Sequence, residues 1–175
     1  MHLTELSIVH ISSFSTIKEI RHQHKPMLYY ETDCAITEQQ RDFLGLVFLI
    51  YHGNTPIGTF RLLQTGHNLT LAERVSDIES LIPIREAWEL ERFVLKKEFR
   101  SLKNIMSIYR EIALWLKNNP EINQIVSISN CRVSDLLTRT GLKVVSKNIE
   151  IDNTPSDYVL LSATVDEICK RLLKT

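Results

Sequence analysis

The apolar residues in the central part of the chain are arranged as two neighbouring strands. A run rich in β-forming residues extends from Phe43 to Tyr51, and a second run, Ile57 to Leu63, follows the turn-forming residues His52 to Pro56. This arrangement predicts a hairpin with a five-residue connection. Weaker strand patterns occur at Leu3 to Ile11, Ile122 to Ile128, Leu142 to Ile151 and Tyr158 to Ala163.

A further strand and a long helix adjoin each other near the middle of the sequence. Ala87 to Leu95 predicts a strand whose side chains alternate between two faces. One face carries Trp88, Leu90, Arg92 and Val94, and the other carries Glu89, Glu91, Phe93 and Leu95. After this strand, apolar residues recur with helical spacing over four turns. They are Leu102, Ile105, Met106, Tyr109, Ile112, Ala113 and Leu116.

Shorter patterns predict the remaining helices. These cover Ser15 to His24, Leu69 to Ile82, Val133 to Thr140, and a last helix that opens with the capping-box residues Thr164 to Glu167. The polar segment Met27 to Gln40 has no clear pattern. The order of elements predicts one domain over residues 1–175 of the α/β (α+β) class, with a mixed, mostly antiparallel central sheet and flanking helices. It lacks the regular βαβ alternation of a doubly wound nucleotide-binding fold.

Composition narrows the classes of function. The 175 residues include 21 basic and 21 acidic side chains, and this balance argues against a dedicated nucleic-acid binder. No apolar run approaches the roughly 20 residues of a membrane span, and the N-terminus lacks a signal-peptide pattern. The three separated cysteines, Cys34, Cys131 and Cys169, fit reduced thiols, and no spacing predicts a metal site. A cytoplasmic protein that binds no metal is therefore expected.

The segment between the strand and the long helix is basic. From Lys96 to Lys103 it has four cations and one anion. A helix N-terminus disfavours positive charge and presents unpaired backbone N–H groups, so cations gathered there indicate an anion site, with a phosphate as the natural ligand. The alternative is a basic turn that is simply solvated.

Glu89 and Glu91 lie on one face of the preceding strand, shortly after Glu86. A carboxylate near a phosphate-attracting turn is a candidate general base. The alternative is an exposed polar face, or an ion pair with Arg92 or Arg61. Because Arg92 shares its face with apolar residues, it needs a carboxylate partner.

These residues resemble the GNAT acyltransferase family. Glu89 to Val94 followed by Glu98 to Ser101 is similar to that family's fourth strand and pyrophosphate turn, and Asn130 and Leu137 to Leu142 resemble its next strand–helix element. Within the family, Gly58 to Thr65 together with Trp88 to Phe93 resembles the acyl-homoserine lactone (autoinducer) synthases. Long-chain N-acyl amino acid synthases have related strand patterns.

The resemblance implies an N-acyltransferase that moves an acyl group from a phosphopantetheine thioester, on acyl-carrier protein or CoA, to a small amine. The thioester is a co-substrate, and no cofactor is bound permanently. Backbone N–H groups of the strand hold its carbonyl, and the basic turn holds its phosphate. Glu89 is the expected base and Glu91 the second candidate, while Arg61 either binds an acceptor carboxylate or pairs with a glutamate inside the fold. The implied donor-binding residues are Phe93, Val94, Leu95, Arg100, Ser101, Lys103 and Asn104.

Departures from the family patterns leave other functions open. The glycines of the usual acetyl-CoA turn are replaced by Lys103 and Ile105, and the frequent general-acid tyrosine by Leu137. The autoinducer synthases lack the same features, and they resemble enzymes that are fed by acyl-carrier protein. Before the hairpin, Arg21 of this chain is similar in position to their early arginine, and Asp42 to one of their two aspartates. The alternatives are an ordinary acetyl-CoA-dependent N-acetyltransferase and a non-catalytic GNAT-shaped binding protein.

Two further groups of side chains have open roles. Met106, Phe48 and Phe60 line either an acyl pocket or the core. Cys131 is a candidate nucleophile for which no base is evident nearby in the sequence.

Overall fold

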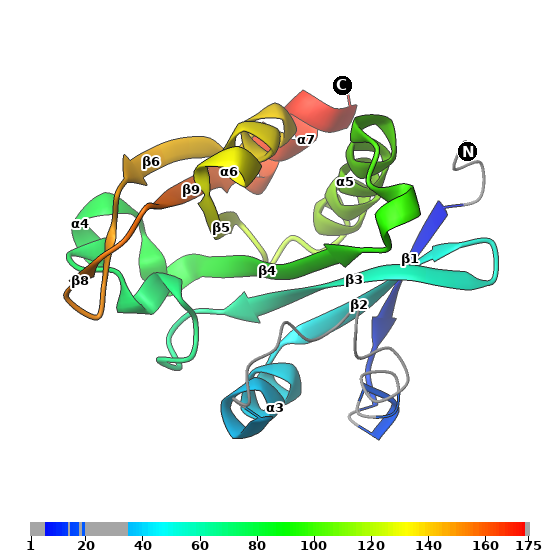
Figure 1. Cartoon of the computed structure of the whole chain (residues 1–175), viewed down its shortest axis with the longest axis horizontal. Helices are drawn as coiled ribbons and strands as arrows, with labels where there is room; N and C mark the ends of the chain where they lie inside the picture. Colours follow the sequence, from blue (N-terminus) through cyan, green and yellow to red (C-terminus); the bar gives the residue numbers. More distant parts are fainter. Residues whose placement is uncertain (1–5, 14, 18, 20–34, 174–175) are drawn as a thin grey trace. The chain divides into compact units, whose positions relative to one another are not determined.

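The computed structural model describes residues 6–13, 15–17, 19 and 35–173. Within these residues, seven strands form one mixed sheet in the order β1-β2-β3-β4-β5-β9-β6 (Figure 1). Their bounds are β1 Leu6–Ile11, β2 Leu46–His52, β3 Thr55–Gln64, β4 Ala87–Leu95, β5 Gln124–Asn130, β6 Lys143–Lys147 and β9 Tyr158–Thr164. The pairs β1–β2, β2–β3, β5–β9 and β6–β9 are antiparallel, and β4–β5 is parallel. The predicted mixed, mostly antiparallel sheet is confirmed.

Helices and a small hairpin accompany the sheet. The helices are α3 Ala35–Leu44, α4 Ile78–Leu81, α5 Leu102–Lys117, α6 Cys131–Leu137 and α7 Val165–Leu173. The hairpin consists of β7 Glu150–Ile151 and β8 Thr154–Pro155. Across the described ranges, no helix combines the length and apolar character needed to cross a membrane.

The chain forms two compact units, each built from separate stretches of sequence. The first contains Met1–Leu63 and Glu91–Glu111. In it, α3 lies on one side of β2 and β3, and the N-terminal part of α5 lies on the other (Figure 1). Phe48 and Phe60, on adjacent strands, are almost fully buried, and their rings stack with centroids 4.5 Å apart. These aromatic side chains form the centre of the first unit's core.

The second unit contains Gln64–Leu90 and Ile112–Thr175. Its strands β5, β9 and β6 pair in that order, and the first residues of β4 pair with β5. One apolar cluster joins the segment after β3 to β5 and β9, and Ala72, Ala87, Val126 and Leu160 are completely buried in it. The capping box predicted for the last helix is present, because Thr164 N–H donates to Glu167 Oε2 and Glu167 N–H to Thr164 Oγ1.

Several sequence predictions match the structure closely, and others are wrong in their bounds. β4 has the predicted limits, and α5 extends the predicted long helix only to Lys117. The strand predicted from Phe43 starts at Leu46 instead, because α3 continues to Leu44. The hairpin connection is Gly53–Asn54, two residues rather than five, since both strands extend into the predicted turn.

Two longer elements predicted in the second unit are interrupted. The helix predicted over Leu69 to Ile82 is replaced by a 3₁₀ turn, Ala72–Arg74, and the short helix α4. A left-handed residue, Asp77 with φ 55°, separates them. The strand predicted from Leu142 ends at Lys147, where Asn148 has φ 53°. The first predicted helix, Ser15 to His24, and the unassigned segment Met27 to Gln40 lie mostly outside the described residues.

Glu73 organises the loop that replaces the predicted helix. Its carboxylate accepts the backbone N–H groups of Gly66 (2.6 Å), Asn68 (3.1 Å) and Thr70 (3.2 Å), and also the Thr70 hydroxyl (2.7 Å). Partial burial by itself would raise the pKa of Glu73, but these hydrogen bonds outweigh it and hold the pKa below the ordinary 4.5. The loop is therefore bound most tightly when Glu73 is ionised.

We expect Glu73→Gln to destabilise the protein by about 1 kcal/mol at neutral pH, because the amide NH₂ cannot accept the N–H groups that the carboxylate binds. The pKa of Glu73 is lower in the folded chain than in the unfolded chain, so its contribution is complete above the ordinary pKa and disappears as the pH falls through the lowered value. Thermal melts of both proteins from pH 7 to pH 3 measure this effect. The exposed Glu79→Gln is the control, and a difference in Tm that grows on acidification would contradict the assignment.

Candidate active site

Strand β4 is irregular near its middle. Its recorded ladder with β5 joins Ala87 to Gln124, Trp88 to Ile125 and Glu89 to Val126. Arg92 then has φ 54°, a left-handed conformation that is rare for a residue with a Cβ and that interrupts the pleat. The predicted strict alternation of faces therefore does not hold through Arg92, and all four side chains from Glu91 to Val94 are half-buried.

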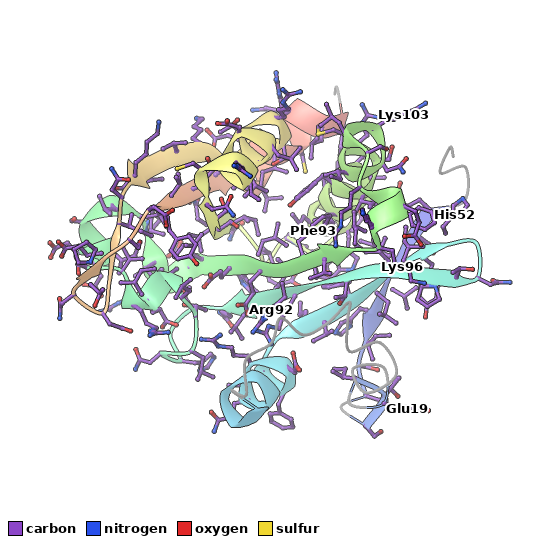
Figure 2. The ribbon with its side chains drawn as sticks, in the orientation of Figure 1. Glu19, His52, Arg92, Phe93, Lys96 and Lys103 are labelled. Carbon is purple, nitrogen blue, oxygen red and sulfur yellow. The ribbon has the colours of Figure 1, made fainter. Side chains whose placement is uncertain are left out.

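The C-terminal half of β4 contacts the long helix α5 within the first unit. Figure 2 shows Arg92 and Phe93 on opposite sides of the β4 ribbon. The Phe93 ring stacks on Tyr109 of α5 with centroids 5.0 Å apart, and burial raises the pKa of that tyrosine. These contacts fix the strand against the long helix.

Close backbone contact with β3 sets the position of the strand end. Lys96 N–H donates to Ile57 O at 2.8 Å. Gly58 lies so near β4 that a Cβ there would collide with Val94 O and lie 2.5 Å from Leu95 Cδ2. A glycine is therefore required where β3 passes the residues predicted to hold the acyl donor.

The basic segment folds into one tight turn that joins β4 to α5. A 3₁₀ turn, Lys97–Phe99, is followed by Arg100, whose Nε donates to Leu95 O at 2.8 Å. Ser101 Oγ accepts Asn104 N–H (3.2 Å), and Asn104 Nδ2 donates to Phe99 O (3.2 Å). The predicted residues Arg100, Ser101 and Asn104 therefore lie together, and their mutual hydrogen bonds shape the turn.

Cations surround this turn at the start of α5. Lys97, Arg100 and Lys103 are exposed, whereas Lys96 is half-buried. Figure 2 shows Lys96 at the end of β4 and Lys103 on the first turn of the helix. The first turn of a helix leaves backbone N–H groups without intrahelical partners, and its dipole attracts negative charge. The arrangement can bind a phosphate.

Arg61 on β3 is enclosed by two carboxylates. Its Nη1 lies 2.6 Å from Asp42 Oδ1, and its Nε lies 2.7 Å from Glu91 Oε1. The side chains of Arg61 and Asp42 are each only 1% exposed, and that of Glu91 is 12% exposed. The sequence indicated a glutamate partner as one of two roles for Arg61, but it did not pair Arg61 with Asp42.

Glu89 belongs to the second unit. It is 2% exposed, and its Oε2 accepts the backbone N–H of Ala72 at 3.1 Å. This contact holds the start of the 3₁₀ turn after β3. The Glu89 carboxylate therefore stabilises the fold by binding this backbone N–H group, whatever part it has in the chemistry.

The remaining predicted residues are placed as follows. Phe48 and Phe60 belong to the core described above, and Met106 is half-buried on α5. Asn130 Oδ1 caps α6 by accepting Val133 N–H at 3.0 Å, and Leu137 is buried. Cys131 is an exposed free thiol whose Sγ lies 3.6 Å from Asp157 O.

Comparison with known proteins identifies the fold. No protein-family model and no curated sequence matches the chain. Among solved structures, FeeM, an N-acyl amino acid synthase from uncultured soil microbes, superposes with a TM-score of 0.68 at 11% identity, covering 97% of this chain and 96% of FeeM.

Two further structures show the same likeness. The AHL synthase LasI superposes with a TM-score of 0.66 at 19% identity, covering 97% of this chain and 94% of LasI. A GNAT family acetyltransferase from Elizabethkingia anophelis with acetyl-CoA bound has a TM-score of 0.62 at 14% identity, covering 92% and 99% of the two chains. The fold of this chain is the GNAT fold, as the sequence resemblance predicted.

Proposed function

We propose that this chain is an N-acyltransferase that moves an acyl group from a phosphopantetheine thioester to an amine acceptor. The observation that carries the proposal is the basic turn from Lys96 to Lys103, which follows β4 directly and opens α5 in a GNAT fold. The structural likeness to FeeM, LasI and an acetyltransferase that holds acetyl-CoA supports the same class of reaction.

The donor in this proposal lies along the C-terminal half of β4. Backbone N–H groups around Phe93, Val94 and Leu95 hold the thioester carbonyl and stabilise the oxyanion that forms on attack. Arg100 and Lys103 bind the phosphate, and Ser101 and Asn104 keep the turn in shape. Because Lys103 and Ile105 replace the glycines that let a backbone wrap a pyrophosphate, we favour a donor with a single phosphate, such as acyl-carrier protein, over acyl-CoA.

The acceptor amine must lose protons to become an amide. Glu89 and Glu91 are the carboxylates that we propose for this transfer, directly or through a water molecule. We also propose that the protein acts in the cytoplasm and that the thioester is a co-substrate, with no cofactor bound permanently.

Mass spectrometry of bacterial cultures tests the function. We expect extracts of cells that express the intact chain to contain an acylated amine, and extracts with Glu89→Gln to contain less of it. Glutamine keeps an oxygen for the Ala72 N–H, so this variant changes the charge with little change in the fold. If no extract contains an acylated product and the purified protein binds neither hexanoyl-CoA nor hexanoyl-carrier protein, the chain is a non-catalytic protein of this fold.

We expect Lys103→Glu to weaken donor binding about tenfold, because it replaces a cation at the helix N-terminus with an anion beside the donor's phosphate. Calorimetric titration with hexanoyl-carrier protein at 50 and 300 mM salt measures the change, and the loss of affinity is expected to be larger at low salt. The exposed Lys147→Glu, on β6 in the second unit, is the matched control. Equal dissociation constants for Lys103→Glu and the parent would contradict the phosphate assignment.

A further inference from the structure

Three charged side chains form an ion cluster in the first unit, and they differ in how far they are exposed to solvent. Asp42 comes from the last turn of α3, Arg61 from β3 and Glu91 from β4. Arg61 and Asp42 are each 1% exposed, so a substrate cannot reach them without unfolding the site, whereas Glu91 keeps 12% of its side chain exposed. Glu91 is therefore the member of the cluster that a small molecule can touch.

The contacts of Arg61 leave little room for an acceptor carboxylate. Two different nitrogens of its guanidinium, Nη1 and Nε, bind Asp42 Oδ1 at 2.6 Å and Glu91 Oε1 at 2.7 Å. A carboxylate-bearing acceptor would have to displace one of these carboxylates from the guanidinium, and breaking a buried ion pair costs several kcal/mol. Arg61 therefore binds carboxylates of the protein itself rather than a carboxylate of the acceptor.

Packing around the arginine fixes this arrangement. A Cβ at Gly45 would lie 3.1 Å from Arg61 Cγ and Cδ and 2.8 Å from Arg41 O. The absence of a side chain at Gly45 therefore makes the room in which the arginine stem lies. With Arg61 held, one oxygen of Glu91 is fixed by Nε, and among the described residues Oε2 has no recorded partner.

We infer that Glu91 receives the ammonium group of the acceptor, that Asp42 and Arg61 are positioning residues for Glu91, and that the acceptor is a cationic amine recognised without a carboxylate. This inference rests on the proposed acyl transfer and deepens it. Oε2 is a hydrogen-bond acceptor, and an ammonium donates three hydrogen bonds, so the two groups are complementary. An acceptor carboxylate would meet the same carboxylate and be repelled.

The reaction balances with these groups. The acceptor enters as an ammonium and gives one proton to Glu91. The neutral amine attacks the thioester carbon and forms the C–N bond, and collapse of the intermediate breaks the C–S bond, whose electron pair leaves with sulfur. A second proton from nitrogen converts the thiolate to a thiol. The products are an amide and a free thiol, and Glu91 returns its proton to solvent.

Matched pairs of acceptors test the substrate class with the unmodified protein. Cadaverine against lysine, tyramine against tyrosine and histamine against histidine differ only in the α-carboxylate. With hexanoyl-CoA or hexanoyl-carrier protein as donor, release of thiol gives kcat/KM for each. We expect the member without the carboxylate to react at least ten times better in the pairs that react. A preference for the amino acid would overturn the inference and leave the proposed acyl transfer intact, whereas absence of turnover and of donor binding would reject both.

Variants test the positioning roles. We expect Glu91→Gln to lower kcat about 100-fold with the dissociation constant for hexanoyl-carrier protein unchanged within twofold. Asp42→Asn is expected to raise KM for the amine and lower kcat with donor binding kept, and Arg61→Lys to retain more activity than Arg61→Met. The exposed Glu121→Gln is the control, and thermal melts verify folding. Losses that follow only the folded fraction, with no change in KM, would assign the cluster a purely structural role.

Discussion

Gly58→Ala is expected to lower the Tm by about 10 °C, because a methyl group added there meets the backbone of the neighbouring strand. A Cβ at position 58 collides with the backbone oxygen of Val94 and lies 2.5 Å from Leu95 Cδ2. A side chain can rotate away, but the carbonyl belongs to β4, so the strand itself must move. Overpacking of this kind costs about 3 kcal/mol.

Thermal unfolding of Gly58→Ala and Thr55→Ala distinguishes two causes of a lower Tm. One is the collision of the new Cβ with β4, and the other is a general loss of stability of strand β3. Thr55 is exposed at the start of the same strand, so its substitution is expected to leave Tm nearly unchanged. Because Val94 and Leu95 belong to the proposed donor strand, hexanoyl-carrier protein is expected to bind more weakly to the Gly58→Ala protein even where it is fully folded. An unchanged Tm would show that β3 and β4 can separate at this point without loss of stability.

The sequence predicts best the elements whose pattern is local and long. The long helix has apolar residues at helical spacing over four turns, and α5 extends only one residue beyond them, from Leu102 to Lys117. The limits of β4 also follow from its own sequence. Periodicity gives the limits of both elements, but it does not place every side chain, because Leu102 is exposed at the start of α5 and Arg92 interrupts the alternation of β4.

The segment from Leu69 to Ile82 shows why other predictions are wrong. Val75, Ile78 and Ile82 have the spacing of a helical face, yet they come from separate short turns that all fill the same apolar cluster. The hydrogen bonds that stabilise those turns come from Glu73, and the reversal of the chain occurs at Asp77, with φ 55°. Val75, Ile78 and Ile82 are buried, whereas Leu81, which the predicted helical face also included, is exposed. The backbone path depends on polar contacts that have no period.

The candidate site could be predicted only in part, for a similar reason. The basic turn is continuous in sequence, so its position was evident from its composition. The partners of Arg61 are 19 and 30 residues away, and no local pattern distinguishes Asp42 from other exposed-looking carboxylates on a polar helix. The left-handed Arg92 in β4 is equally invisible, because β-strand patterns carry no information on a single reversed φ.

Arg61→Met is expected to destabilise the protein by about 3 to 5 kcal/mol, because it leaves the buried carboxylate of Asp42 and the largely buried carboxylate of Glu91 without their shared cation. Both anions contact the guanidinium at 2.7 Å or less. Methionine fills much of the volume of the arginine stem, so the loss measures removal of the cation from the two carboxylates more than a cavity. Chemical denaturation followed by circular dichroism gives the free energy of unfolding.

Two comparisons show whether the destabilisation by Arg61→Met comes from the loss of the cation that Asp42 and Glu91 share. Arg85, which is 88% exposed and lies 3.9 Å from Glu79, is the matched arginine at the surface, and Arg85→Met is expected to change stability by no more than the error of the measurement. In a background with Asp42→Asn, the cost of Arg61→Met is expected to fall by about 1 to 3 kcal/mol, since one of the two stranded anions has already been neutralised. If the cost is the same in both backgrounds, Asp42 and Arg61 are independent, and the positioning pair proposed for Glu91 does not exist. A coupling of the expected size between Asp42 and Arg61, together with weaker amine binding by Asp42→Asn, would show that the same ion pairs stabilise the fold and position Glu91 for the proposed reaction.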